Sequence, residues 1–185
     1  MLRVSSAYLR GCSRQLSRLR SARGGATAVE FALIAPVFLA TLIAIFEVAL
    51  FLFAQQYLQT AATEAGRQFM TGQVQGSGQT EQQMITNVIC PQIQTLFDCS
   101  SVMVNVQSFS SFSSANSATP TLTFNAQGQV TNNWAYNPGN PGDVMVVQLI
   151  YQWPIVSGPF GYVLANLGNG KTEVVGVAAF RVEPY

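Results

Sequence analysis

Two carboxylates, Glu30 and Glu47, need explaining before any other feature of this sequence, because both belong to a long apolar run. Glu30 stands at its head and Glu47 inside it, in RGGATAVEFALIAPVFLATLIAIFEVALFLF. A carboxylate at the centre of a bilayer costs about 2.5–3.5 kcal/mol on insertion scales, so a retained acid normally has a partner or lines a polar path. Acid–base catalysis is a weak interpretation, because the chain has no histidine, the commonest general base.

The apolar run is long enough to cross a membrane. Between Phe31 and Phe53 it is interrupted only by Pro36, Thr41 and Glu47. As a helix it would cover roughly 35 Å, against about 30 Å of hydrocarbon core. The 185-residue chain is 49% hydrophobic and only 9% charged, which is too apolar for a small soluble domain. The sequence therefore predicts one transmembrane segment, residues 31–53.

Charge is divided sharply along the chain. Residues 1–25 hold six arginines and no acid, whereas the rest holds three cations against eight acids, a net charge of −5. A basic segment directly before a span stays on the cytoplasmic side, so we expect a cytoplasmic N-terminus and a translocated C-terminal part. A mitochondrial transit peptide has a similar Arg- and Ser-rich composition, but the span and the cysteines that follow make that interpretation weaker.

Cysteine usage agrees with export. Cys12 lies in the basic leader, and Cys90 and Cys99 lie beyond the span in CPQIQTLFDC. If the leader is removed, the only pair left closes a short loop, which suits an oxidising periplasm. Two buried thiols that merely pack are the alternative. Nothing in the spacing suggests a metal site.

The elements after the span predict an α+β fold. Helix-compatible residues continue to Thr71, which gives one helix over 26–71 with an apolar stripe formed by Leu58, Ala62, Ala65 and Phe69. A second helix starts at Thr80, where TEQQ offers a capping box with Gln83. Pro91 limits this helix, and the chain can either resume the helix or unwind before Cys99.

Three strands are expected beyond the cysteines. Valines alternate over 102–106, and β-formers fill 144–154 and 172–182. The Ser-, Asn- and Gly-rich segment between the first two strands is typical of a long surface loop, with one short strand at 122–124. Residues 162–167 could form a helical turn. We expect an antiparallel sheet of about three strands packed on the distal half of the long helix.

The start of the long helix resembles a processed prepilin. In GGATAVEF, Glu30 is the fifth residue after Gly25, which matches a basic leader ending in Gly, a cut, and a Glu at the fifth mature position. The resemblance implies cleavage by a membrane prepilin peptidase between Gly25 and Ala26. A cut after Gly24 is the alternative and would move Glu30 to the sixth position. Cleavage would leave an amino group on Ala26 that can pair with Glu30 of the same or a neighbouring chain.

The resemblance narrows to the TadE-like minor pseudopilins of tight-adherence (Tad/Flp, type IVc) pilus systems. The early Pro36, the acid in IFE, and the late segments PGDVMVVQLIYQWP and AAFRVEPY are similar to that family. The resemblance implies that Glu30 is a packing carboxylate and that Phe31 begins the helix neighbours share. Pro36 would kink the helix, with or without a role in packing. For Glu30, a plainer alternative is that it favours the helix start through the helix dipole.

The implied function is assembly of the pilus, with no catalytic residue, metal or cofactor. Expected partners are the prepilin peptidase, sibling pseudopilins, the assembly platform and the membrane, with no nucleic acid and no small-molecule substrate. The expected location is the bacterial inner membrane, single pass, with incorporation into the pilus left open. The domains are then a cleaved leader (1–25), a long helix (26–71) and a periplasmic head (72–185). Two alternatives remain: an uncleaved bitopic envelope protein with a binding head, and a protein secreted through a conventional signal peptide cut near Ala62.

Glu47 lies seventeen residues beyond Glu30, so at about 100° per residue the two acids face different sides of one helix. No cation lies within a turn or two of it. We therefore expect its partner on another chain, such as a sibling pseudopilin or the platform. The alternative is that the span ends before Glu47, which would then reach water.

Overall fold

The structure is a computed structural model that describes residues 25–115, 120–155, 165, 167 and 169–184. The basic leader with Cys12 and most of the segment 162–167, where a helical turn was predicted, lie outside these residues. The chain divides into two compact units, Met1–Ala44 and Ile45–Tyr185. Each unit is described by itself.

The first long element is helix α2, Gly25–Met70, which contains Pro36. It matches the predicted helix over 26–71 to within one residue at each end. Within the second unit its stripe of Leu58, Ala62, Ala65 and Phe69 is fully buried, as the 3.6-residue periodicity indicated. Ala54 and Ala61 extend the buried stripe. Small alanines let the sheet approach the helix closely.

Short helices follow α2. Gly72, in the left-handed conformation with φ 73°, precedes α3 (Gln73–Ser77), a helix that the glycine-rich sequence did not predict. Helix α4 (Glu81–Met84) starts with the predicted capping box. The amide of Gln83 donates to Thr80 Oγ1 at 3.3 Å, and the amide of Thr80 donates to Gln83 Oε1 at 3.0 Å. This reciprocal pair satisfies two helix-end donors.

Of the two outcomes left open for the chain after Pro91, the structure shows helix, which continues to Ile93. A π-helical turn, η1 (Ile85–Ile89), follows α4 directly, and α5 (Cys90–Ile93) then carries Pro91 in its first turn. In a regular α-helix the proline ring clashes with the carbonyl four residues earlier. The wider π turn displaces the preceding carbonyls, so the chain passes through Pro91 without unwinding.

The sheet has three antiparallel strands in the order β1-β2-β3. These are β1 (Met103–Phe109), β2 (Val144–Pro154) and β3 (Lys171–Arg181). The bounds of β2 and β3 lie within one residue of the prediction, whereas β1 continues three residues beyond the predicted 102–106. The α+β class is confirmed. The short strand predicted at 122–124 is reduced to an isolated bridge between Phe124 and Val130. Two backbone hydrogen bonds flank the bridge, from the amide of Asn125 to the carbonyl of Gln129 and from the amide of Thr131 to the carbonyl of Thr123.

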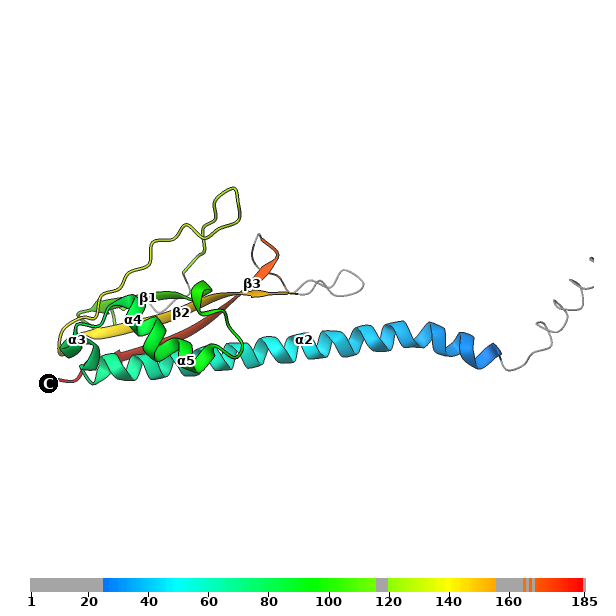
Figure 1. Cartoon of the computed structure of the whole chain (residues 1–185), viewed down its shortest axis with the longest axis horizontal. Helices are drawn as coiled ribbons and strands as arrows, with labels where there is room; N and C mark the ends of the chain where they lie inside the picture. Colours follow the sequence, from blue (N-terminus) through cyan, green and yellow to red (C-terminus); the bar gives the residue numbers. More distant parts are fainter. Residues whose placement is uncertain (1–24, 116–119, 156–164, 166, 168, 185) are drawn as a thin grey trace, which may run out of the picture. The chain divides into compact units, whose positions relative to one another are not determined.

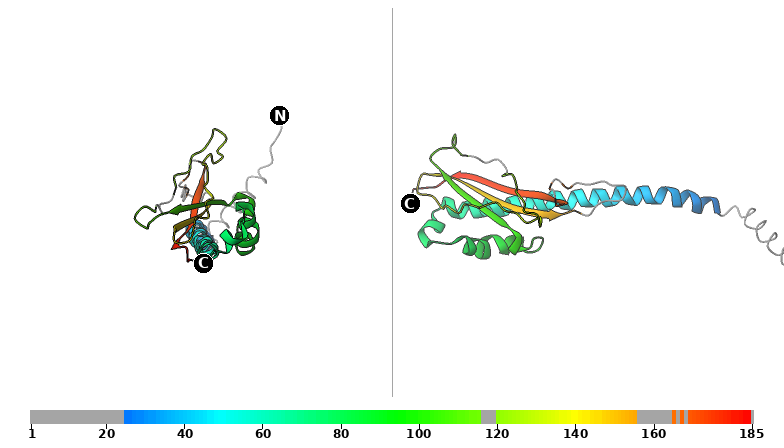
Figure 2. Two further views of the ribbon diagram at one scale, coloured as in Figure 1. Left: turned by 90° about the vertical axis from the view of Figure 1, so that its left-hand side faces the viewer. Right: turned by 90° about the horizontal axis from the view of Figure 1, so that it is seen from above.

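In the second unit, the distal part of α2 lies along the sheet and the α4–α5 segment runs beside that helix (Figures 1 and 2). Buried side chains from the helix, the short helices and the strands form one hydrophobic core. The outer edge of β1 is partly covered by the long surface loop: the amide of Val106 donates to the carbonyl of Ala135 at 2.7 Å, and the amide of Asn137 donates to the carbonyl of Val106 at 2.9 Å.

Candidate functional site

The first half of α2 presents an apolar surface that no described residue of its own unit covers. The first eight large exposed hydrophobic residues are Val29, Phe31, Leu33, Ile34, Val37, Phe38, Leu39 and Ile43, and each is 48–73% exposed. Exposed apolar surface this continuous marks a site for a membrane or a protein partner. By length and composition α2 can cross a bilayer.

Glu30 lies on this exposed segment, six residues into the helix when Gly25 is counted as the first. The first turn of α2 contains no acid. The structure places Glu30, Phe31 and Pro36 on one continuous helix and leaves their functional roles as predictions.

Glu47 lies on a different face, in register with the buried stripe. Phe51, Ala54 and Leu58 follow it at spacings of four, seven and eleven residues, so Glu47 begins the stripe that packs on the sheet. Its Oε1 is buried and has no hydrogen-bond partner among the described residues. The spacing of the two acids alone could not indicate that Glu47 points toward its own head domain.

A seam between α2 and β3 was not predicted from the sequence. The amide nitrogen Nε2 of Gln55 donates to the carbonyl of Val175 at 2.6 Å. Gln59 bonds Val177 twice: its Nε2 donates to the carbonyl at 2.7 Å, and its Oε1 accepts from the amide at 3.0 Å. The carboxamide of Gln59 therefore replaces a neighbouring strand at the open edge of β3. This protects an edge that would otherwise pair with other chains.

Two glycines allow the helix and the strand to approach closely. A Cβ on Gly176 would lie 2.5 Å from the carbonyl oxygen of Leu58, and a Cβ on Gly66 would lie 2.8 Å from the ring of Phe180. The first contact is with backbone, which cannot rotate away. A glycine inside a strand pattern is the signal that indicates such an approach.

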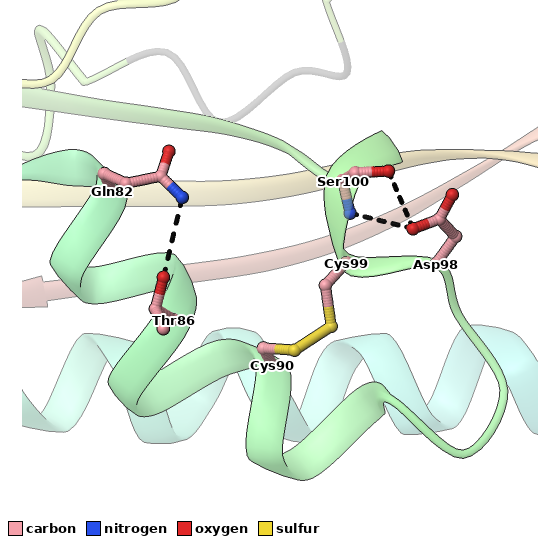
Figure 3. Close-up of a disulfide and its surroundings, with 6 residues drawn as sticks. All are labelled: Gln82, Thr86, Cys90, Asp98, Cys99 and Ser100. Carbon is pink, nitrogen blue, oxygen red and sulfur yellow. Dashed lines mark hydrogen bonds between the residues drawn. A yellow bond between two sulfur atoms is a disulfide. The ribbon is translucent and has the colours of Figure 1, made fainter.

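Cys90 and Cys99 form the predicted disulfide, with 5.5 Å between their Cα atoms (Figure 3). The bridge joins the start of α5 to the 3₁₀ turn η2 (Cys99–Ser101). Between the two cysteines, Phe97 makes edge-to-face contacts with Tyr151 and Trp153 of β2. The disulfide therefore fastens a short loop whose aromatic residue anchors it to the sheet.

Three titratable groups among the described residues of the second unit have shifted pKa values. Hydrogen bonds from the hydroxyl and amide of Ser100 lower the pKa of Asp98, which caps the turn after the disulfide loop (Figure 3). Burial raises the pKa of Glu173 on β3. Burial also raises the pKa of Tyr136 to about 12, and its hydroxyl donates to the carbonyl of Gln79 at 3.1 Å. These groups are far apart in the chain and serve separate local contacts. Over the described ranges, no cluster of three or more acids or cysteines could hold a metal ion.

A family model described as TadE-like protein matches residues 25–67, the stretch that contains Gly25, Glu30, Pro36 and Glu47. No curated protein and no solved structure matches the chain. The match covers the helix that carries both acids and stops before α3. The resemblance drawn from the sequence is thereby confirmed, and this chain is consistent with a TadE-like protein of Tad pilus systems.

Proposed function

We propose that this Tad pilus-associated protein is a minor pseudopilin, cleaved after Gly25 by a prepilin peptidase and used in assembly of the pilus. The observation that carries the proposal is the exposed apolar start of α2, with Glu30 as the fifth residue after Gly25. A helix of this kind can pass from the bilayer into a bundle of similar helices, because either environment buries its apolar side chains.

The proposed role of Glu30 is to pair with an α-amino group. Cleavage would give Ala26 a positive terminus, and in a bundle that charge would offset the cost of carrying Glu30 out of water. The pairing can be within one chain or between neighbours. The proposed orientation, with a cytoplasmic N-terminus and a periplasmic head, is supported by the six arginines before Gly25. The disulfide is compatible with an oxidising compartment.

The conventional signal-peptide alternative is opposed by the core of the head. A cut near Ala62 would remove Ala54 and Leu58, both of which are fully buried. Loss of a buried Leu alone typically destabilises a protein by about 2–5 kcal/mol. The head that remained would also lose Gln55 and Gln59 from the edge of β3.

The deciding experiment is the intact mass and N-terminal sequence of the protein extracted from membranes, from cells with and without an active prepilin peptidase. We expect a chain that begins at Ala26 only when the peptidase is active. A start at Met1 in both strains would replace the proposal with an uncleaved envelope protein. A start near Ala62 would indicate secretion. A start at Gly25 would keep the proposal but move the cut to Gly24.

We also propose that Glu47 meets a cation of another chain, a sibling pseudopilin or the assembly platform. Its buried Oε1, which has no hydrogen-bond partner among the described residues, supports this, since a buried carboxylate without a partner is unfavourable. Its register with the sheet-facing stripe restricts the approach of that cation to the end of the stripe. If Glu47→Gln left both pilus assembly and partner association at wild-type levels, the pairing would be wrong.

A further inference from the structure

The edge of β3 is covered by glutamine side chains over only part of its length. In an antiparallel sheet, the backbone groups of alternate residues point to the same side of a strand. Because Val177 faces Gln59, Ala179 and Arg181 also turn their amides and carbonyls away from β2. Among the described residues, no hydrogen bond is made by these outward groups of Ala179 or Arg181.

Ala179 of this uncovered edge lines a groove of about 570 Å³ between α2 and β3. Gly66 and Met70 of the helix and Val177–Phe180 of the strand form an apolar floor, and Thr63, Glu64 and Arg67 form a polar rim. Hydrogen bonds to α2 flank this stretch of the edge. Gln59 bonds Val177 on one side, and the amide of Glu183, two residues beyond the end of β3, donates to the carbonyl of Met70 at 3.0 Å on the other.

The rim carries one acid and one base that do not pair. Glu64 and Arg67 are three residues apart on one helix face, where an ion pair is possible, yet no salt bridge joins them or links either to another described residue. Each is free to pair with an incoming chain. A strand laid along the edge would present side chains two residues apart, about 6.5–7 Å, toward the rim.

We propose that this groove binds an extended segment of a partner protein, which adds as a strand to the edge of β3 at Ala179. The segment has an acid placed at Arg67 and a base two residues away placed at Glu64. Backbone hydrogen bonds to Ala179 and Arg181 hold it, and small apolar side chains contact Phe180 and Gly66. This is strand addition, in which main-chain bonds provide affinity and alternate side chains provide specificity. The site belongs to the head domain and does not depend on cleavage after Gly25.

The test uses the full-length protein in lipid nanodiscs and three synthetic six-residue peptides in an alternating Thr/Val background. One carries Asp-Val-Lys at its centre, one carries Lys-Val-Asp, and one carries Thr-Val-Thr. Binding is measured by fluorescence anisotropy, and the site is identified by amide chemical shifts and hydrogen exchange. We expect one charge order to bind about fivefold to tenfold more tightly than the other, since each rim pair contributes about 0.2–1 kcal/mol. The amides of Ala179 and Arg181 should be the most protected.

Two matched variants separate the parts of the proposal. Ala179→Pro removes the outward N–H without breaking the β2–β3 ladder, whereas Ala179→Val keeps it. We expect only the proline variant to abolish binding, with the disulfide and the near-ultraviolet spectrum unchanged in both. The double variant Glu64→Arg/Arg67→Glu should reverse the preferred charge order. Equal binding of all three peptides by the wild type, binding by the proline variant, or protection at other residues would overturn the proposal.

Discussion

At the residue scale, two carboxylates of the head oppose each other in their response to pH. Ser100 lowers the pKa of Asp98 below its ordinary 3.8, so Asp98 stabilises the fold above that value and its contribution is lost as pH falls through the folded-state pKa. Burial raises the pKa of Glu173 above its ordinary 4.5. The folded state therefore holds that proton more tightly than the unfolded chain, and Glu173 disfavours folding at neutral pH.

We predict that Glu173→Gln raises the free energy of unfolding at pH 7 and has progressively less effect as pH falls toward 4.5, where the wild-type carboxyl becomes protonated. Urea unfolding at several pH values, followed by tryptophan fluorescence, measures this. Asp98→Asn is the control of opposite sign, because it should lower stability at pH 7 and lose its effect only below pH 3.8. Parallel pH profiles for wild type and Glu173→Gln would contradict the assignment.

Gly176 gives a sharper prediction, because its missing Cβ leaves room for the backbone of Leu58. We expect Gly176→Ala to destabilise the head by about 1–3 kcal/mol, since a contact of 2.5 Å with a carbonyl oxygen forces β3 away from α2. The control is Gly76→Ala in α3, where a Cβ meets nothing within 4 Å. That change should be neutral or stabilising by up to about 1 kcal/mol. Equal unfolding midpoints for the two variants would contradict the close approach of β3 to α2 at Gly176.

At the element scale, periodicity predicted the long helix, the helix that starts after Thr80 and the three strands, but not α3 or the π-helical turn. The contacts between the elements were not predictable. The stripe from Leu58 to Phe69 and the alternating valines of β1 each repeat a local pattern, so their buried faces can be deduced from neighbours in sequence. Gln55 and Gln59 bond residues 120 and 118 positions away, and glutamine on a helix surface normally indicates only solvent. The π-helical turn before Pro91 has no sequence pattern that distinguishes it from an α-helix, so it could not be predicted.

The hydrogen bonds between Gln59 of α2 and Val177 of β3 predict which backbone amide becomes less protected from hydrogen exchange when they are removed. Gln59→Ala should leave the amide and carbonyl of Val177 half-buried without a partner, at a cost of about 1–3 kcal/mol. Amide hydrogen exchange at Val177 should accelerate more than exchange at Val174, whose backbone faces β2. Gln56→Ala, three residues earlier on the same helix and with an exposed side chain, is the matched control and should leave both rates unchanged. Unchanged exchange at Val177 in Gln59→Ala would mean that water replaces the glutamine without loss.

At the scale of the whole molecule, the candidate site could be proposed from the sequence because its residues lie close together along the chain. Gly25, Glu30, Pro36 and Glu47 lie within twenty-three residues, so spacing alone gives their order on the helix. What the sequence could not give is which acid faces the head. That required the stripe of Phe51, Ala54 and Leu58, which places Glu47 on the side of the sheet and leaves Glu30 on an exposed segment. The two acids of one helix therefore have separate tasks under the proposed function.

A matched pair of substitutions tests that division of tasks. Glu30→Gln and Glu47→Gln each remove one charge from the same helix and preserve side-chain size, so neither should reduce membrane insertion. If Glu30 pairs with the amino group of Ala26, Glu30→Gln should lower pilus assembly about tenfold or more, as loss of one desolvated charge pair predicts. Glu47→Gln should instead weaken the association of the extracted protein with its partner chain. Both effects are measured by pilus counts and by site-specific cross-linking from α2 in intact membranes. Identical phenotypes for the two variants would mean that they report one general property of the helix, its charge, and that neither acid has a partner of its own.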